Sequence, residues 1–458
     1  MMAAWSTLRD VRREAALNTR DFEKARLQRF RRFAAFAVAN SSWYADIARE
    51  HSIDPSRATP SDFPVLTKSI LMQNFDRVVT DQRVTKEALT SFLEVSKDPR
   101  ERFLGRYRVM HTSGTSGEVG YFVYSGVDWI RGMMAGVARR RERRSMRSAR
   151  PRARGGRFRV AFYGATGGHF AGVTMATAIQ GGFASLFVES RAFEINAPLA
   201  DTLAQLNAYQ PDMLSGYTAA LRVLGDAQAA GRLNIAPRGI GATGETVTQA
   251  DMAALREQFG CEVISAYGCT EHLGLGSSDP GGETMTLSDH NLIWEFFPDH
   301  TLITNMFNRT LPLIRYRMSD VLTPLERPAD APHRLVVKNL VGRTERVPIF
   351  ENASGERDFI SPHTINEIFV PGVPRFQLHI TGPSSFRFLV VLAGDLDDAG
   401  RAAAIAGVNA RLREILTEKR MSNVTFEVVG TNDLPVNART RKFQLIMDDR
   451  EATSCPDS

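Results

Sequence analysis

Hydrophobic spacing divides the chain into stretches of different type. Between residues 6 and 50, apolar residues recur at helical intervals among many arginines, which predicts amphipathic helices. DFPVLTKSIL, at 62–71, predicts a turn followed by a helix start, with Thr67 as the N-cap. YFVYS, at 121–125, has the pattern of a strand, and DWIRGMMAGVARRRER, at 128–143, has that of a helix.

From residue 158 onward, strand patterns alternate with helix patterns. The predicted strands are FRVAFYG (158–164), FASLFVE (183–189), DMLSGY (212–217), IAPRGIGATGE (235–245) and CEVISAYG (261–268). The predicted helices are VTMATAIQ (173–180), LADTLAQLNAYQ (199–210), TAALRVLGDAQAAG (218–231) and ADMAALREQFG (250–260). The alternation predicts an α/β fold with a parallel or mixed sheet covered by helices. Ligands in such folds bind at the carboxyl ends of the strands, where the glycine-containing segments of this chain fall.

The pattern changes twice more toward the C-terminus. TMTLSDHNLIWEFF (284–297) and HTLITNMFN (300–308) have the pattern of antiparallel strands. Beyond residue 343, further strand and helix patterns are sufficient for a small α+β domain. We therefore predict a large domain over 1–341 and a smaller one over 342–458.

Composition narrows the class of protein. The chain has 458 residues, 43% of them hydrophobic and 24% charged, which is typical of a soluble enzyme. It has no signal-like N-terminal segment and no run of about 18 apolar residues, so we expect a cytoplasmic protein without a membrane partner. Cys261, Cys269 and Cys455 lack the spacing of a zinc site or a disulfide framework, and neither is expected.

The net charge of +6 has a local source at residues 139–159, where more than half of the residues are arginine. Such a stretch can be a nucleic-acid or membrane patch, a solvated helix end, or a surface that attracts a polyanionic cosubstrate. Aromatic residues are not interleaved with the arginines, as base stacking would require. We favour the solvated helix end and expect no nucleic-acid partner.

HTSGTSG, at 111–117, suits a phosphate group. Its glycines permit left-handed backbone, and its amides and hydroxyls can converge on one point. The hydroxyl residues are Thr112, Ser113, Thr115 and Ser116. The spacing GxxxxGK[ST] of the P-loop is absent, and a flexible turn is the alternative interpretation.

Six segments, taken in order, resemble the adenylate-forming superfamily of acyl-CoA and aryl-CoA ligases, and most closely the phenylacetate-CoA ligase branch with its capsule-biosynthesis relatives. They are HTSGTSG (111–117), TGE (243–245), YGCTE (267–271), PLIRYRMSD (312–320), GRTE (342–345) and the lysine of RTRKFQ (439–444). The resemblance implies a large domain with mixed sheets and a mobile C-terminal domain. It also implies activation of a small carboxylic acid by ATP and Mg²⁺, thioester formation with coenzyme A, and a homodimer by analogy.

The resemblance assigns roles to residues of these segments. The hydroxyl loop holds the β- and γ-phosphates of ATP, with Gly244, Glu245 and Gly268 also in the nucleotide site. Tyr267 faces adenine, Thr270 contacts the α-phosphate and Glu271 binds Mg²⁺. Asp320 and Arg343 hold the ribose, Glu345 is the hinge residue and Lys442 is the catalytic lysine. From the residues alone, YGCTE could equally be a strand end with a buried tyrosine, and Lys442 part of a solvated basic tail.

The acid pocket is expected between YGATGGHFAG (163–172) and GATGE (241–245). Its candidate lining residues are Tyr163, His169, Phe170 and Ala242, which suit an acid with an apolar or aromatic body. His169 could instead be a structural histidine.

The chain departs from the family pattern at the hydroxyl loop. Relatives often carry a lysine directly after this loop, where this chain has Glu118 and Val119, so arginines or Mg²⁺ would have to compensate. Two other hypotheses stay open. The acyl group could pass to an amine, a carrier protein or another small nucleophile instead of coenzyme A. Alternatively, the protein could bind nucleotide or nucleic acid without turnover.

Overall fold

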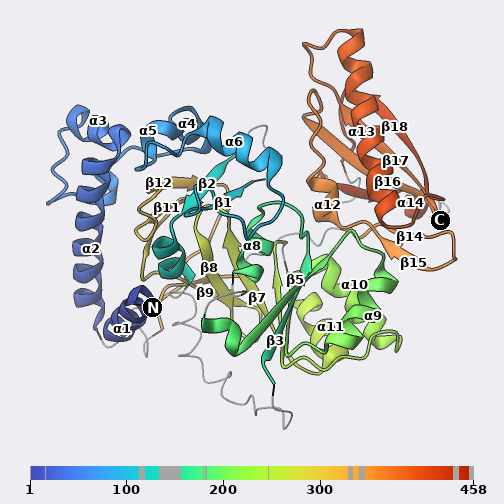
Figure 1. The fold of residues 1–458 in the computed structure, drawn as a ribbon, viewed down its shortest axis with the longest axis horizontal. Helices are drawn as coiled ribbons and strands as arrows, with labels where there is room; N and C mark the ends of the chain where they lie inside the picture. Colours follow the sequence, from blue (N-terminus) through green and yellow to red (C-terminus); the bar gives the residue numbers. More distant parts are fainter. Residues whose placement is uncertain are drawn as a thin grey trace.

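The fold follows from a computed structural model that describes residues 2–15, 17–112, 119–133, 156–178, 180, 183–245, 247–328, 334–339, 346–436 and 443–452. Helices at the N-terminus flank a central mixed sheet, and a smaller C-terminal part lies against the other side of that sheet (Figure 1). The fold class predicted from the sequence, a large α/β domain followed by a smaller part, is confirmed. Within the described residues, no helix is long and apolar enough to cross a membrane.

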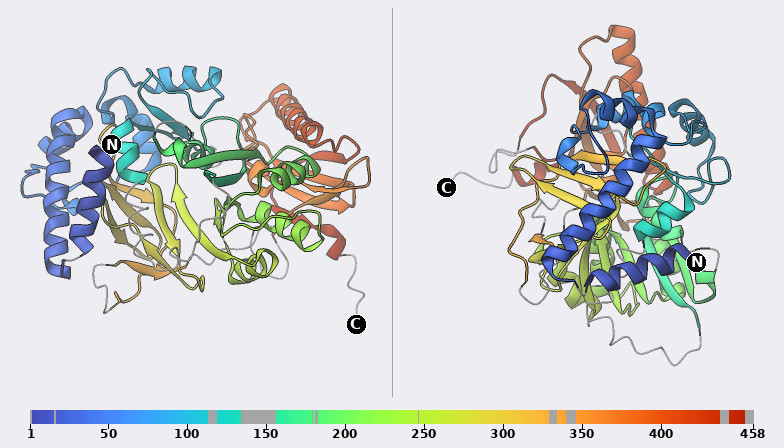
Figure 2. Two further views of the ribbon diagram at one scale, coloured as in Figure 1. Left: turned by 60° about the horizontal axis from the view of Figure 1, so that its bottom comes forward. Right: turned by 90° about the vertical axis from the view of Figure 1, so that its left-hand side faces the viewer.

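The N-terminal region is helical, as its amphipathic pattern predicts. Its elements are α1 (Met2–Ala15), α2 (Thr19–Asn40), α3 (Ser42–Glu50), the 3₁₀ turn η1 (Pro60–Asp62), α4 (Lys68–Gln73), α5 (Phe75–Val78) and α6 (Lys86–Val95). Helix α2 buries Phe22, Phe30 and Phe33 on one face. The hydroxyl of Thr67 accepts a hydrogen bond from the Ile70 amide, so the predicted N-cap is confirmed. Figure 2 shows α1 and α2 lying across the outer side of the domain.

The central sheet has eight strands in the order β13-β9-β8-β7-β6-β5-β3-β4. Strands β3 (Phe158–Gly164), β4 (Val188–Glu194), β5 (Met213–Tyr217), β6 (Gly239–Thr243) and β7 (Glu262–Cys269) are parallel to one another. Strands β8 (Leu273–Ser278), β9 (Thr284–Leu287) and β13 (Val336–Lys338) continue the sheet in antiparallel pairs. The sheet is therefore mixed, and the carboxyl ends of its five parallel strands lie at one edge.

Helices connect the parallel strands. They are α8 (Ala171–Thr177), α9 (Leu199–Tyr209), α10 (Thr218–Ala229) and α11 (Gln249–Phe259). A separate three-stranded antiparallel sheet contains β10 (Leu292–Phe296), β11 (Thr301–Asn305) and β12 (Leu313–Met318). A short hairpin pairs β1 (Arg108–His111) with β2 (Tyr121–Tyr124). These elements confirm most of the predicted strands and helices in this region.

One predicted strand is displaced along the sequence. FASLFVE at 183–189 begins as a 3₁₀ turn, η3 (Phe183–Leu186), and the strand β4 starts only at Val188. Parallel pairing with β3 sets this start, because Phe158 stands opposite Val188 and Gly164 opposite Glu194. The predicted helix at 128–143 is helical over 126–133, and most of the arginine-rich stretch lies outside the described residues.

The C-terminal part has its own hydrophobic core. It contains a hairpin of β14 (Ile349–Glu351) and β15 (Arg357–Phe359), and helices α12 (Pro362–Asn366), α13 (Asp398–Glu418) and α14 (Asp449–Ala452). Its four-stranded sheet has the order β18-β17-β16-β19, from β16 (Arg375–Gly382), β17 (Ser385–Val391), β18 (Thr425–Thr431) and β19 (Ile446–Asp448). The predicted boundary at 341 and 342 falls between described residues and stays a prediction.

Side chains of α12 and α13 contact the large domain directly. The ring of His363, on α12, lies 4.2 Å from the ring of Tyr217 at the end of β5. Nζ of Lys419, which follows α13, donates to the carbonyl oxygens of Ile195 and Ala197 at 3.2 and 3.1 Å. The C-terminal part is thus held against the carboxyl edge of the parallel strands.

Candidate active site

The stem of the hydroxyl loop is closed by Thr112 and Gly120. The Thr112 amide donates to the Gly120 carbonyl at 3.0 Å, and the Gly120 amide donates to Oγ1 of Thr112 at 2.9 Å. These two hydrogen bonds continue the β1 and β2 hairpin and fix the positions at which the loop begins and ends. Ser113, Thr115 and Ser116 lie outside the described residues, so their predicted phosphate contacts stay predictions.

YGCTE forms the end of β7 and a tight turn into β8. Gly268 is required there, because a Cβ atom would stand 2.9 Å from the backbone oxygen of Leu273. The carbonyl of Thr270 accepts a hydrogen bond from the Tyr124 hydroxyl at 2.7 Å, which joins the turn to β2. Glu271 therefore sits at the tip of a turn that is anchored to the hydroxyl-loop hairpin.

Tyr267 and Asp320 meet across the site, although 52 residues of sequence lie between them. The Tyr267 hydroxyl donates to Oδ2 of Asp320 at 2.7 Å. Burial raises the pKa of the Tyr267 hydroxyl far above its ordinary value, and the nearby Asp320 carboxylate adds to the rise. Asp320 follows β12, so this bond brings the PLIRYRMSD and YGCTE segments together.

Glu271 lies in the same electrostatic environment. Burial raises the pKa of its carboxyl group, the Asp320 carboxylate adds to the rise, and the Lys68 ammonium opposes it. Among the described residues no group of three or more metal-ligating side chains occurs. The predicted role of Glu271 as a Mg²⁺ ligand stays a prediction.

The TGE segment has a structural role that the sequence did not reveal. Gly244 has φ of +77°, and a Cβ atom there would stand 2.7 Å from the Tyr217 ring. The Glu245 carboxylate then turns back and accepts a hydrogen bond from the Ala219 amide, in the first turn of α10, at 2.7 Å. A nucleotide role for Gly244 and Glu245 stays a prediction beside this capping interaction.

The four predicted acid-pocket residues do not share one surface. Tyr163 and Ala242 are fully buried in the core of the parallel sheet, where Tyr163 faces Phe359 of β15. Phe170 is half-buried and its ring lies 4.6 Å from that of His111, the residue before Thr112. Phe170 therefore lies near the loop stem, and Tyr163 contacts the C-terminal hairpin instead.

His169 is buried beside α6. It contacts Oγ of Ser96 at 2.9 Å, and its ring packs on Phe92 and lies 5.2 Å away. Burial lowers the pKa of its imidazole. These contacts agree with the structural interpretation of His169 that the sequence left open.

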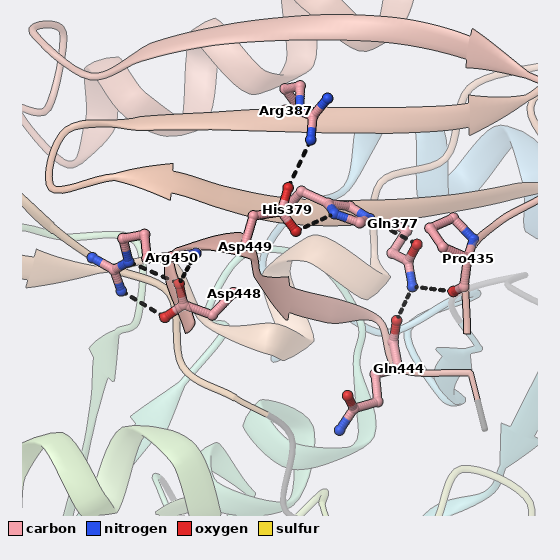
Figure 3. A network of polar contacts seen from close by, with 8 residues as sticks. All are labelled: Gln377, His379, Arg387, Pro435, Gln444, Asp448, Asp449 and Arg450. Carbon is pink, nitrogen blue, oxygen red and sulfur yellow. Dashed lines mark hydrogen bonds and ion pairs between the residues drawn. The ribbon is translucent and has the colours of Figure 1, made fainter. Parts of the chain in front are cut away.

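Both flanks of the segment that carries Lys442 are held by one side chain. Nε2 of Gln377, a buried residue of β16, donates to the carbonyl oxygens of Pro435 at 3.0 Å and Gln444 at 2.6 Å (Figure 3). His379 holds the amide oxygen of Gln377 through Nε2 at 2.9 Å, and Asp449 contacts the other ring nitrogen. Lys442 itself, with Arg343 and Glu345, lies outside the described residues, and the roles of all three stay predictions.

The C-terminal part contains a cavity of about 420 Å³. Residues between α12 and β16 line it, among them the exposed Phe369, together with Phe443. The cavity contains none of the candidate site residues. Polar groups of three segments that are distant in sequence converge instead at the carboxyl end of β7.

Comparisons with known proteins support the fold. No protein-family model and no curated protein matches the chain. Among solved structures, 2-hydroxyisobutyryl-CoA ligase with 2-HIB-AMP and CoA in the thioesterification state has a TM-score of 0.57 at 16% identity, covering 97% of this chain and 94% of that chain. An open conformation of the same ligase with the same two ligands has a TM-score of 0.52 at 16% identity, covering 95% and 94%.

The postadenylation state of that ligase, in complex with 2-HIB-AMP, gives a TM-score of 0.52 at 16% identity, with 96% of this chain and 92% of that chain covered. At such identities the similarity establishes the fold over nearly the whole of both chains. The chain has the mixed α/β fold of these ligases, with a large N-terminal domain and a smaller C-terminal part.

Proposed function

We propose that the protein activates a carboxylic acid with ATP, forming an acyl-adenylate and pyrophosphate, and then transfers the acyl group to coenzyme A. One observation carries the proposal. The hairpin that bounds the hydroxyl loop, the segment 267–271 and the segment 312–320 meet at the carboxyl end of β7. The bonds from Tyr124 to Thr270 and from Tyr267 to Asp320 join them.

The roles of the site residues follow from their chemistry. Adenylation requires an acid oxygen to attack the α-phosphorus in line while pyrophosphate leaves, so charge on the phosphate groups must be neutralised. The Asp320 carboxylate can accept hydrogen bonds from both ribose hydroxyls, and the Tyr267 hydroxyl already fixes one of its oxygens. Thr112 and Gly120 fix the two ends from which the hydroxyl loop starts and returns.

The buried carboxylate of Glu271 fits a divalent cation. When bound, Mg²⁺ would offset negative charge on the phosphate oxygens during the transfer. Glu271 offers a hard oxygen ligand, and burial raises the pKa of its carboxyl group, so a bound cation would favour the ionised form. The cation would supply the neutralising charge that the chain, with Glu118 and Val119 after the loop, lacks at that position.

Coenzyme A is the acceptor that the fold similarity favours. The structure with the TM-score of 0.57 is a CoA ligase in its thioesterification state, and the other two states of that ligase have TM-scores of 0.52 to 0.53. In the present arrangement α12 contacts the edge of β5 through His363 and Tyr217. We infer that this arrangement corresponds to the transfer step, and that the C-terminal part turns to bring Lys442 to the adenylation step.

Pyrophosphate release tests the proposal. The protein is incubated with ATP and Mg²⁺ over a panel of aryl and alkyl carboxylic acids, with and without coenzyme A. We expect acid-dependent release, accelerated by coenzyme A and reduced at least about 10-fold in Asp320→Asn, since a charged hydrogen-bond partner of ribose is lost. Glu257→Gln, an exposed change on α11, is the matched control and leaves the rate unchanged.

Two outcomes would revise the proposal. Acid-dependent pyrophosphate release at a rate that coenzyme A does not change would indicate that the acyl group passes to an amine or a carrier protein. Nucleotide binding without release for any acid in the panel would contradict an adenylating enzyme.

A further inference from the structure

The helix α4 brings a cation to the hydroxyl loop. Lys68 is the first residue of α4, and the N-cap Thr67 fixes the start of that helix. A Cβ atom placed on Gly120 would stand 3.0 Å from Cε of Lys68 and 3.3 Å from Oγ1 of Thr112. The lysine side chain and the threonine hydroxyl therefore border the same small space at the mouth of the loop.

A backbone contact holds α4 in this position. Leu66 pairs with Tyr316 in an isolated parallel bridge. The Leu66 amide donates to the Arg315 carbonyl at 3.1 Å, and the Arg317 amide donates to the Leu66 carbonyl at 2.9 Å. Since the two strands run in the same direction, Lys68 and Asp320 leave the bridge toward the same side.

The contact at Gly120 and the bridge at Leu66 are independent observations. The first places the Lys68 side chain beside the loop stem, and the second fixes the segment that carries it against β12, which ends two residues before Asp320.

We propose that Lys68 is the phosphate-binding lysine of this protein, contacting the β- and γ-phosphates of ATP from α4 in place of a lysine after the hydroxyl loop. This rests on the proposed function, because it names a residue of the same nucleotide site. Cε of Lys68 borders the same space as Oγ1 of Thr112, the residue at which the loop begins, and the Tyr124 hydroxyl ties the hairpin of that loop to Thr270, next to Glu271. Lys68 and Mg²⁺ together would offset the charge of the leaving pyrophosphate.

The position of Lys68 on a helix also lowers the cost of ordering its side chain when nucleotide binds. A lysine inside the loop would belong to a segment of Gly, Ser and Thr, whereas Lys68 belongs to a helix that packs on the core through Leu71 and Met72. Its Cα is therefore fixed by the fold before any nucleotide binds. The cost of ordering the cation is restricted to its own side chain.

Nucleotide affinities test the proposal with the full chain. Equilibrium dialysis gives the dissociation constants of ATP, in the presence of Mg²⁺, and of AMP, for the wild type, Lys68→Ala, Lys68→Arg and the exposed control Lys24→Ala. We expect Lys68→Ala to weaken ATP binding by roughly 10- to 100-fold and AMP binding by less than about 2-fold, because AMP lacks the two phosphates that the lysine contacts. Lys68→Arg should recover part of the ATP affinity, and Lys24→Ala should change neither constant.

The comparison of ATP with AMP distinguishes the results that would contradict the proposal. Unchanged ATP affinity in Lys68→Ala would overturn the proposal. An equal loss of ATP and AMP affinity would also overturn it, since the lysine would then support the site as a whole. A wild-type protein that binds neither nucleotide would contradict the proposed function itself, and the assignment of Lys68 with it.

Discussion

Nζ of Lys419 lies 2.8 Å from Oδ1 of Asp358, and both side chains are withdrawn from solvent. The other oxygen of Asp358 accepts a hydrogen bond from the Leu199 amide, at the start of α9, at 2.9 Å. The ammonium group also lies over the Phe359 ring, 4.7 Å from its centroid. One buried ion pair thus joins the end of α13, the β14 and β15 hairpin and the large domain.

Removing the cation should destabilise the protein strongly. Lys419→Met leaves the Asp358 carboxylate buried without its ion-pair partner, and we expect the free energy of unfolding to fall by about 3 to 5 kcal/mol. Urea denaturation followed by circular dichroism measures the change. The neighbouring Arg420→Ala is the control, since its ion pair with Asp201 is exposed and should contribute less than about 1 kcal/mol. Equal effects of the two changes would contradict the structural importance of the buried pair.

The Tyr267 hydroxyl should matter for nucleotide binding more than for folding. Tyr267→Phe removes the hydrogen bond to Asp320, and we expect the KM for ATP to rise roughly 10-fold, equivalent to about 1.4 kcal/mol. Steady-state pyrophosphate release at varied ATP concentration measures it. Tyr107→Phe is a matched control, because the Tyr107 hydroxyl donates to Oδ2 of Asp81 over the same 2.7 Å outside the site. A similar rise in both variants would point to a general loss of structure.

Gln377 should affect the adenylation step in particular. Gln377→Met removes both donors that hold the flanks of the Lys442 segment, and we expect acid-dependent exchange between ATP and pyrophosphate to slow by roughly 10- to 100-fold. Transfer to coenzyme A from a presynthesised acyl-adenylate should change little. Gln228→Met is the control. The Gln228 side chain also makes two hydrogen bonds to backbone groups, the carbonyl and the amide of Ile235, but near α10. Equal slowing of both half-reactions would argue against a role in positioning Lys442.

The two histidines whose pKa values are lowered most should make stability sensitive to acid. Burial lowers the pKa of His272 to about 3 and that of His363 to about 4. Between these values and the ordinary value of 6.5, the unfolded chain binds more protons than the folded one, so stability rises with pH in this window and is lost as the pH falls below 6.5. Each histidine contributes a slope of up to about 1.4 kcal/mol per pH unit.

Urea denaturation at pH 7.5, 6.0 and 5.0 measures this loss. His363→Gln should remove part of it, because one of the imidazoles with a strongly lowered pKa is gone. The exposed His51→Gln should leave the pH dependence unchanged. A wild-type protein equally stable at all three pH values would show that neither ring is held neutral by burial.

Local pattern was sufficient to predict much of the fold. The amphipathic helices before residue 50, the Thr67 cap and most of the alternation after residue 158 depend on neighbours in sequence, which is what periodicity and capping residues report. β4 was misplaced because its start is set by pairing with β3 and not by the apolar run at 183–187. The residue ranges of β4 therefore required the tertiary partner.

For the candidate site, too, the sequence pattern identified residues but not the tertiary contacts that bring them together. Tyr267, Glu271 and Asp320 could be named from motifs, but their convergence depends on contacts across more than 50 residues. Lys68 belonged to a segment whose helix start was predicted correctly, yet its approach to the loop follows from the bridge between Leu66 and Tyr316. Tyr163 was assigned to a pocket because small residues follow it in sequence, but its ring is buried beside Phe359 of β15, a partner that lies almost 200 residues away in the sequence.

The largest hydrophobic core also constrains how the chain can fold during synthesis. It combines residues between Phe30 and Trp129 with residues between Leu273 and Val337, while the parallel strands between them have a core of their own. The N-terminal helices therefore leave the ribosome well before the strands that cover their apolar faces. The middle segment can fold first. The apolar faces of the N-terminal helices stay uncovered, and open to binding by chaperones, until about three quarters of the chain has been translated.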